Sequence, residues 1–323
     1  MLPLFSFCTG GIRRHCCEGT WGGAMVTKQE ITDGLVELGL RAGDTVVAHS
    51  SLKSFGEVDG GADAVVDALL EVLGPDGTLV VPTFNFEPGV FDRANTPSIV
   101  GKITEVVRTR PNAIRSNHPT HSVTAIGRLA EAITEGHDKV DPFARGSALH
   151  KAAQVGAKIL QLGVTHTTNS TIHVAEEIAK VPYLERQRYV GIKLPNGTVV
   201  NKWIRRPGCS QGFNAIDEAL YEQDAISEVM IGNCKARLMS ARTLVDAAVE
   251  MLNFDAASLL CMRPDCGICA ESRAMISATE SEMQDRKITE LAEEEERIRR
   301  QAERQLTGNV SYFEPDGEKC SPN

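Results

Sequence analysis

The sequence predicts an α/β fold: a three-layer α/β/α arrangement around a mixed, partly parallel central sheet. Two observations predict it. Short apolar strands alternate along the chain with segments whose apolar residues recur at helical spacing. The 323 residues, 42% apolar and 24% charged, also have the composition of an ordinary soluble globular protein that can share one core. Alternation of this kind places helices over a sheet that is at least partly parallel.

The first half of the chain carries the alternation. A strand is expected over residues 44–49 (DTVVAH), followed by a polar turn and a helix over residues 62–73. A Gly-Pro-Asp-Gly turn ends that helix, and TLVVP forms the next strand. The pattern then repeats as a helix over 104–110, a strand over 121–126, a helix over 148–155 and a strand over 158–164.

The second half changes character at a predicted β-hairpin. Residues 189–203 are two strands joined by Pro195, Asn196 and Gly197, a typical turn sequence, so we expect a mixed sheet. Helices follow over residues 213–223 and 241–252.

The two ends of the chain differ in composition from its middle. We expect residues 1–24 to be an unstructured leader or an extension of the reading frame, residues 25–280 to be the folded domain, and residues 307–323 to be a frayed tail. Residues 281–306 predict a charged helix, with acidic residues early and arginines late, as the helix dipole favours. Its thin apolar stripe fits docking on the body, or on a second copy in a homodimer, as well as it fits a solvated helix.

Charge and hydropathy exclude some classes of function. A net charge of −9 argues against broad nucleic-acid binding, which needs a basic face. No apolar run approaches the length needed to cross a bilayer, and charged residues interrupt any signal-like core in residues 1–24. The nine cysteines, an odd number, do not look like a secreted disulfide framework, so we expect a cytoplasmic protein.

The cysteines near the C-terminus require a metal site to be considered. Cys261, Cys266 and Cys269 include one C-x-x-C, but neither a second C-x-x-C nor a downstream histidine supplies the fourth ligand that structural zinc needs. Only Cys234 is considered for that place. We therefore interpret these cysteines as free thiols and expect no metal.

Familiar catalytic and phosphate-binding signatures are absent or fail. Gly208 to Gly212 match the G-x-S-x-G pattern, but a nucleophile elbow needs a later histidine, and all eight histidines lie at or before His173. There is no G-x-x-x-x-G-K-[ST], no G-x-G-x-x-G after a strand and no H-E-x-x-H.

Two polar turns are candidate ligand sites. The turn H-S-S-L with Phe55 and Gly56 follows the first strand, at the strand end where open α/β sheets bind ligands. A tight loop that uses serine for its own hydrogen bonds is the alternative interpretation. Arg115 opens a second polar cluster and can hold a phosphate or carboxylate by two bonds, although a loop arginine is often merely exposed.

Residues 161–178 (QLGVTHTTNSTIHVAEEI) carry the strongest functional signal. If Asn169 or Ser170 caps the helix, His173 lies in its first turns, where the helix dipole favours a neutral imidazole. Glu176 and Glu177 lie one turn further on the same face. Such a carboxylate can fix the tautomer of the ring and stabilise its cation. From these residues alone, a catalytic role for His173 and a purely structural one are about equally supported.

Several motifs follow one another in a fixed order between about residue 26 and residue 261, and together they indicate a protein family. HSSLKSFGEVDGGADAVVDALLEVLGPDGTLVVPTF, RSNHPTHSVTAIG, DPFARGSALHKAAQVGAKILQLGV, NSTIHVAEE and VPY together resemble the aminoglycoside 3-N-acetyltransferase family of antibiotic N-acetyltransferases. The resemblance implies a mixed sheet between helical layers and an acetyltransferase domain over residues 25–280. It implies transfer of acetyl from acetyl-CoA to an amine of an aminoglycoside, on the deoxystreptamine ring, and hence antibiotic resistance.

The resemblance also implies roles for individual residues. His173 is the general base and Glu176 its orienting partner, with direct transfer and no acetyl-enzyme. A hydroxyl is retained at Ser170, so an oxyanion contact there is open, whereas His166 matches no fixed family position. The remaining implied residues line the coenzyme A channel: Ser50, Ser51, Leu52, Phe55, Gly56, Arg115, Ser116 and Ser122.

The chemistry is consistent with this assignment, because an alkylammonium must lose a proton before it attacks a thioester. A polycationic acceptor also calls for carboxylates, and Glu87, Asp92, Asp217 and Glu218 are candidates. Two alternatives stay open: acetylation of another amine, such as a biosynthetic intermediate, and a non-catalytic protein that binds coenzyme A or a metal.

Overall fold

The computed structural model describes residues 25–194 and 196–307. The predicted leader, Pro195 of the predicted hairpin turn, and all but the first residue of the predicted tail therefore lie outside the described residues.

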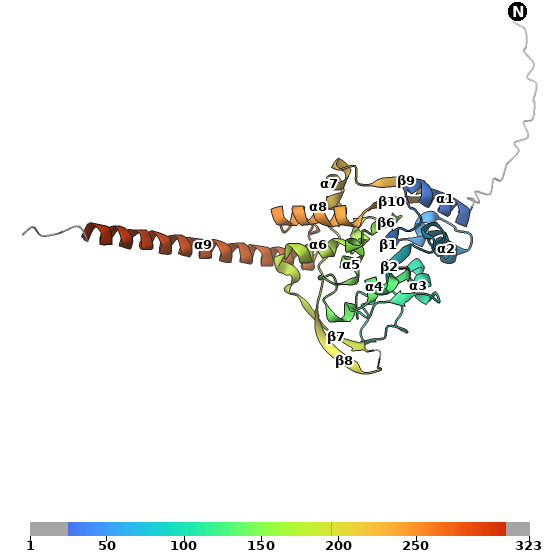
Figure 1. The fold of residues 1–323 in the computed structure, drawn as a ribbon, viewed down its shortest axis with the longest axis horizontal. Helices are drawn as coiled ribbons and strands as arrows, with labels where there is room; N and C mark the ends of the chain where they lie inside the picture. Colours follow the sequence, from blue (N-terminus) through green and yellow to red (C-terminus); the bar gives the residue numbers. More distant parts are fainter. Residues whose placement is uncertain (1–24, 195, 308–323) are drawn as a thin grey trace, which may run out of the picture.

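A seven-stranded mixed sheet forms the centre of the molecule (Figure 1). β1 pairs in parallel with β2 and β6, and the other neighbours pair antiparallel. The strand order is β4 (Ile114–Arg115), β5 (Val123–Gly127), β2 (Thr78–Pro82), β1 (Thr45–Ser50), β6 (Lys158–Leu162), β10 (Cys234–Ser240) and β9 (Ser227–Ile231). This confirms the mixed, partly parallel sheet.

Alternating side chains of the central strands enter two separate cores, which makes the fold three-layered. Val46, next to Val47 on β1, packs in the core under one helical layer, and Val47 packs in the core under the other. The first layer comprises α1 (Lys28–Leu38), α2 (Gly61–Leu73) and α3 (Lys102–Thr109). The second comprises α4 (Ala130–Thr134), α5 (Ala148–Gln154), α6 (Ile172–Ala179) and α8 (Ala241–Phe254). The predicted α/β/α arrangement is confirmed.

The predicted hairpin exists, but it does not belong to the central sheet. β7 (Gln187–Lys193) and β8 (Val199–Arg205) pair antiparallel, with Tyr189 opposite Trp203, and join β3 (Val90–Phe91) in a small second sheet. The antiparallel pairs of the central sheet come from β4, β5, β9 and β10 instead. The sequence interpretation missed the β9–β10 hairpin altogether.

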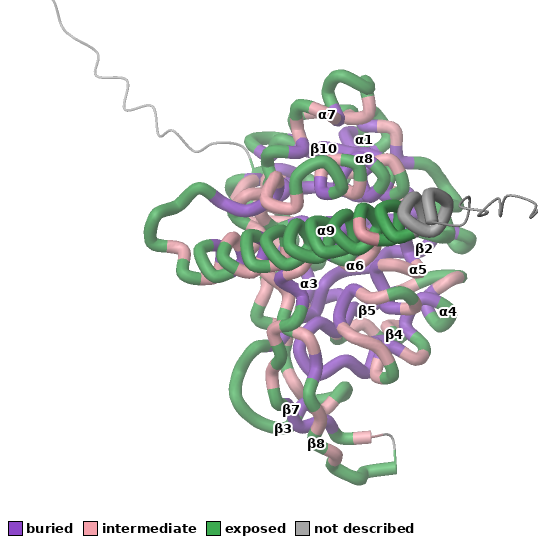
Figure 2. The backbone as a smooth tube through the Cα atoms, turned by 90° about the vertical axis from the view of Figure 1, so that its left-hand side faces the viewer, coloured by how far each residue is buried: buried purple, intermediate pink, exposed green. Residues whose placement is uncertain are grey.

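The C-terminal helix is longer than predicted. α9 (Gly267–Thr307) is one helix of 41 residues, so the charged segment from residue 281 continues a helix that begins well before it. α9 projects away from the body in Figure 1 and is mostly exposed in Figure 2. No side chain of residues 281–300 is buried. The helix predicted over 213–223 is divided into η5 (Phe213–Ile216) and α7 (Asp217–Glu222).

Four more short 3₁₀ turns connect these elements: η1 (Leu52–Phe55), η2 (His137–Lys139), η3 (His166–Thr168) and η4 (Pro182–Glu185). Across residues 25–194 and 196–307, no helix combines the length and the apolarity that spanning a bilayer requires.

Candidate active site

A cavity of about 620 Å³ opens where the first two parallel strands end. His49 and Ser50 at the end of β1 and Pro82 at the end of β2 line it, together with His173 of α6 and Ile204 of β8. The volume is that of an ordinary small-molecule site. The position is the one expected for ligands of an open α/β sheet, because the strands of such sheets direct their carboxyl ends to one edge.

His173 lines this cavity and forms a buried pair with Glu176, which does not line it. His173 Nδ1 lies 2.6 Å from Glu176 Oε2, and the hydroxyl of Tyr183 donates to Glu176 Oε1 at 3.0 Å. The imidazole is 6% exposed and the carboxylate is fully buried. Since Glu176 accepts at both oxygens, it fixes the proton of His173 on Nδ1 and leaves Nε2 with a free lone pair.

Aromatic rings hold the imidazole in one orientation. Phe143 stacks on His173 with ring centroids 4.9 Å apart, and Phe213 meets its edge at 4.8 Å. α6 begins at Ile172 after Thr171, and no side chain caps it, so neither Asn169 nor Ser170 is the helix cap considered from the sequence. His173 still lies in the first turn, and Ser170 lines the cavity beside it.

The neighbouring His166 occupies a different environment. It is fully buried, bonds to the Asn169 side chain through Nδ1 at 3.1 Å, and does not line the cavity. Burial and the charge of Arg237 lower its pKa to about 4, so its 3.3 Å contact with Asp217 involves a neutral ring at neutral pH. The arrangement separates a buried structural histidine from the cavity-facing His173.

Of the residues expected in the turn H-S-S-L with Phe55 and Gly56, the structure brings His49 and Ser50 to the cavity. Ser50 lines it, and its hydroxyl is buried without a hydrogen-bond partner among the described residues. Ser51, Leu52, Phe55 and Gly56 are not in the cavity wall. Phe55 is 1% exposed in the core under α1 and α2, where it anchors η1.

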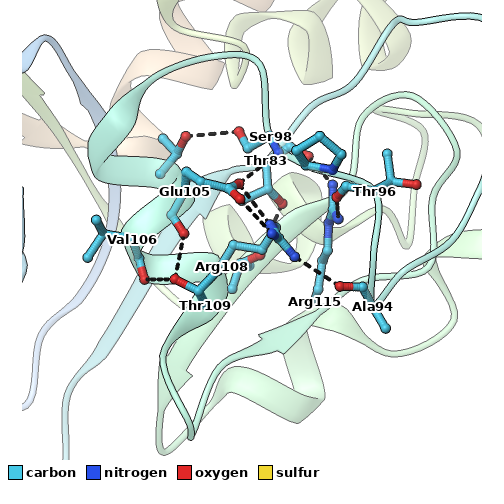
Figure 3. A network of polar contacts seen from close by, with 12 residues as sticks. Thr83, Ala94, Thr96, Ser98, Glu105, Val106, Arg108, Thr109 and Arg115 are labelled. Carbon is cyan, nitrogen blue, oxygen red and sulfur yellow. Dashed lines mark hydrogen bonds and ion pairs between the residues drawn. The ribbon is translucent and has the colours of Figure 1, made fainter.

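Arg115 does not line the cavity, and its guanidinium is hydrogen-bonded within the protein itself (Figure 3). Its guanidinium donates to the hydroxyl of Ser122 at 3.0 Å and to the carbonyls of Thr83, Arg93 and Thr96. Burial lowers its pKa to about 10, which leaves it charged at neutral pH. These bonds tie the end of β2 and the loop before α3 to β4, and neither Arg115 nor Ser122 lines the cavity.

Ser116 is also buried outside the cavity wall. Its hydroxyl bonds to His137 Nδ1 at 2.9 Å and accepts the amide of Val123 at 2.9 Å. His137 Nε2 in turn lies 3.0 Å from the carbonyl of Pro142. Ser116 thus links the end of β4 to the start of β5, with which β4 pairs antiparallel.

Two further histidines line the cavity: His49 of the predicted H-S-S-L turn and His121 of the polar cluster that Arg115 opens, neither of which was assigned a role from the sequence. His121 is packed edge-on against Phe84 at 4.8 Å and Phe143 at 5.0 Å, and burial and His173 hold its pKa well below the ordinary value. His49 has an unpartnered Nε2, and burial lowers its pKa to about 3. Both positions follow from sequence only through the placement of the strand ends.

Positive charge gathers along one side of the cavity. Arg188, Arg205 and Arg206 line it. Arg205 is compensated, because it bonds to Glu177 at 2.8 Å and lies 3.6 Å from Asp141. Arg206 is exposed and has no ion pair within the described part of the chain. This side suits an anionic ligand group.

The carboxylates considered for a cationic acceptor do not meet at the cavity. Glu87, Asp92, Asp217 and Glu218 are all outside its wall, and the described residues that line it include no aspartate or glutamate. Asp92 instead pairs with Lys193 at 2.9 Å, and hydrogen bonds hold its pKa well below the ordinary value.

The fold and the site define an α/β protein with an imidazole–carboxylate pair on a ligand-sized cavity, and comparisons with known proteins identify the family. The model of the family described as aminoglycoside 3-N-acetyltransferase matches residues 47–253. Aminoglycoside N(3)-acetyltransferase IV of Salmonella sp is 32% identical over 232 residues, which cover 71% of this chain and 88% of that protein. The SPbeta prophage-derived aminoglycoside N(3')-acetyltransferase-like protein YokD of Bacillus subtilis (strain 168) is 30% identical over 248 residues, which cover 69% and 90%.

A solved structure agrees with these relatives. Aminoglycoside acetyltransferase AAC(3)-IVa, crystallised as a histidine-to-alanine mutant in complex with a gentamicin, superimposes with a TM-score of 0.73 at 30% identity, covering 78% of this chain and 98% of that one. The chain belongs to the aminoglycoside 3-N-acetyltransferase family and is an acyltransferase of that class, as the resemblance predicted.

Proposed function

We propose that this protein transfers the acetyl group of acetyl-CoA directly to the 3-amino group of the deoxystreptamine ring of an aminoglycoside, and so confers resistance. The observation that carries the proposal is His173 on the cavity wall, paired through Nδ1 with the buried Glu176, so that Nε2 of the imidazole is left free as a base. The family match over residues 47–253 supports the acceptor class.

In the proposed step, Nε2 of His173 removes one proton of the acceptor ammonium, and the freed amine attacks the carbonyl carbon of the thioester. The carbon–sulfur bond of the tetrahedral intermediate then breaks, and the leaving coenzyme A thiolate takes the proton of the imidazolium. The excess proton that remains on the acceptor nitrogen passes to solvent, which leaves a neutral amide. Glu176 stabilises the imidazolium between these events, because it is a buried carboxylate 2.6 Å from Nδ1.

The donor is proposed to lie along the arginine side of the cavity. Coenzyme A is polyanionic, and Arg188 and Arg206 line the cavity without an ion pair in the described residues, although Arg188 donates to the carbonyl of Phe86 at 2.8 Å. Ser50 Oγ and His49 Nε2 lack partners, and a ligand atom that bonds to either recovers about 1–3 kcal/mol of desolvation cost. Of the residues predicted for the coenzyme A channel, Ser50 is thus proposed to contact the ligand, whereas Arg115, Ser116 and Ser122 hold the wall behind it.

One observation favours a second acceptor class. The cavity wall offers no carboxylate among the described residues, although a polycation would gain from one. A singly charged amine, such as a biosynthetic intermediate, fits this wall with less loss than an aminoglycoside does.

The release of free thiol from acetyl-CoA distinguishes the two acceptors. We expect turnover with at least one deoxystreptamine aminoglycoside, and mass spectrometry to place one acetyl group on its 3-amino nitrogen. Turnover of simple amines with none of the aminoglycosides contradicts the acceptor assignment while leaving acetyl transfer intact. A chain that releases no thiol with either class contradicts the enzymatic proposal.

Two further expectations belong to this proposal. We infer that the protein works in the cytoplasm, where acetyl-CoA is available, and cell fractionation tests this. We also infer a homodimer that uses the exposed apolar side chains of α9, Met283, Ile288, Leu291 and Ile298. Sedimentation equilibrium tests the mass of the assembly, and a monomer at all concentrations contradicts it.

A further inference from the structure

Four cysteine side chains meet at the base of α9. The sulfur atoms of Cys209, Cys261, Cys266 and Cys269 all lie within 4.8 Å of one another. They come from three separate segments: the loop after β8, the loop after α8, and the first turn of α9. The sulfurs of Cys209 and Cys261 are 3.9 Å apart although the residues are 52 positions apart in the chain.

The fourth cysteine is not the one considered from the sequence. Cys234 is buried in the core under α1 and α2, away from this cluster. Cys209, inside the failed G-x-S-x-G match, takes its place instead. The interpretation of Cys261, Cys266 and Cys269 as unrelated free thiols rested on the missing fourth ligand, so the structure removes its basis.

We propose that these four cysteines bind a structural Zn²⁺ ion. Four sulfurs at about 2.3 Å from a zinc ion in a tetrahedron stand roughly 3.8 Å from one another. The 3.9 Å between Cys209 and Cys261 matches that spacing, whereas a disulfide bond would need about 2.05 Å. Thiolate ligands select zinc among the abundant divalent ions of the cell, because zinc is softer than magnesium or calcium.

Two hydrogen-bond donors lie at the cluster. The backbone amide of Gln211 donates to Cys209 Sγ at 3.4 Å, a bond that favours the charged sulfur. The guanidinium of Arg273 bonds to the carbonyl of Cys261 at 3.0 Å and so brings positive charge to the cluster. Cys261 and Cys269 are buried and the other two are half-buried, which leaves little room for water to compete.

The coordination identifies the role of the ion. Four protein thiolates complete a tetrahedral shell, so the zinc has no open position for water or substrate and is structural. None of the four cysteines lines the catalytic cavity. Their neighbours do, because Gly208 and Ser210 flank Cys209 and Ile268 lies between Cys266 and Cys269. The zinc therefore joins the start of α9 to the cavity wall.

The first test is the metal content of the full chain purified in reductant without added metal or chelator. We expect about one zinc ion per chain by elemental analysis, and at least a tenfold loss in Cys209→Ser. Cys234→Ser is the matched control, since it removes a buried cysteine outside the cluster and should keep the ion. Equal zinc in the wild type and Cys209→Ser overturns the assignment, because the ion would then belong to other ligands.

A second measurement covers the case in which Cys209→Ser does not fold. Titrating the wild-type chain with an organomercurial should release zinc to a chromogenic chelator, and cobalt replacement should give the thiolate-to-cobalt charge-transfer bands of a four-sulfur site. A wild-type chain with neither zinc nor cobalt uptake, and with the mass of two disulfides, overturns the proposal in favour of a redox cluster. Neither the zinc content nor the cobalt spectrum depends on acetyl transfer, so failure of the zinc proposal and failure of the proposed function can be distinguished.

Discussion

At the residue scale, the two nitrogens of His173 have different tasks. Nδ1 is held by Glu176, which leaves Nε2 to accept the proton of the acceptor amine. Replacing His173 by Ala should lower kcat/KM for acetyl transfer by about 10²–10⁴-fold, the usual contribution of a general base. His150→Gln is the control, because His150 lies in α5 outside the cavity wall. Near-full activity in His173→Ala, measured by thiol release, contradicts the assignment.

Glu176 and Tyr183 allow orientation to be separated from proton transfer. Glu176→Gln keeps the shape but can donate to Nδ1, which favours the wrong tautomer, so we expect a loss of about 10²-fold or more in kcat. Tyr183→Phe removes only the 3.0 Å bond to Glu176 Oε1 and should cost far less. If kcat of the Tyr183→Phe variant is as low as that of Glu176→Gln, the expected ranking of the two variants is contradicted. Tyr183 would then take part in proton transfer.

At the element scale, α9 has two parts with different neighbours. Its first turn carries Cys269 and lies under Arg186, which donates to Ser272 Oγ at 2.6 Å and to the carbonyl of Ile268 at 2.8 Å. From residue 281 to residue 300, by contrast, no side chain is buried. The predicted boundary between residues 280 and 281 is therefore proposed as the functional end of the acetyltransferase domain.

Two truncations test that boundary. A chain that ends at Glu280 keeps the buried side of α9 and should retain the thermal midpoint and kcat/KM within about twofold, because exposed positions contribute little. A chain that ends at Asp265 loses two of the four clustered cysteines and the bonds to Arg186, and should unfold at a clearly lower temperature. If both truncated chains lose stability and activity to the same extent, or if neither loses any, the proposed boundary between residues 280 and 281 is contradicted.

Local signals in the sequence predicted the elements that have strong periodicity. The four longer strands before residue 165 (β1, β2, β5 and β6), and His173 in the first turn of its helix, follow from local pattern because each signal is contiguous, whereas the two-residue strands β3 and β4 were not predicted. The β9–β10 hairpin was missed although Gly232-Asn233 is a two-residue turn sequence between alternating segments. Arg115 reads as a loop cation, but its carbonyl partners lie 19 to 32 positions away, so only the folded chain shows that it is occupied. Cys209 joins its partners across 52 positions for the same reason.

At the scale of the whole molecule, buried neutral histidines should make the protein sensitive to acid. Burial lowers the folded-state pKa of His137 to about 4, below the ordinary 6.5, so between these values only the unfolded chain binds the proton. Stability from this group is complete above pH 6.5 and is lost as the pH falls toward 4, by about 3 kcal/mol in total. His49, with a pKa of about 3, acts in the same direction.

Urea unfolding at several pH values measures this loss. The free energy of unfolding should fall between pH 6.5 and 4, and His137→Gln should reduce the slope by up to about 1.4 kcal/mol per pH unit while lowering stability at pH 7.5. An unchanged slope in His137→Gln means that the ring is not the group that resists protonation.

The length of α9 changes how the size of this protein must be measured. At 1.5 Å per residue its 41 residues extend over about 60 Å, whereas a compact chain of this length has a radius of gyration of about 20 Å. A single chain will therefore experience more drag than a sphere of equal mass. A gel-filtration column calibrated with compact standards will report it as heavier than it is, so early elution alone cannot count as a dimer.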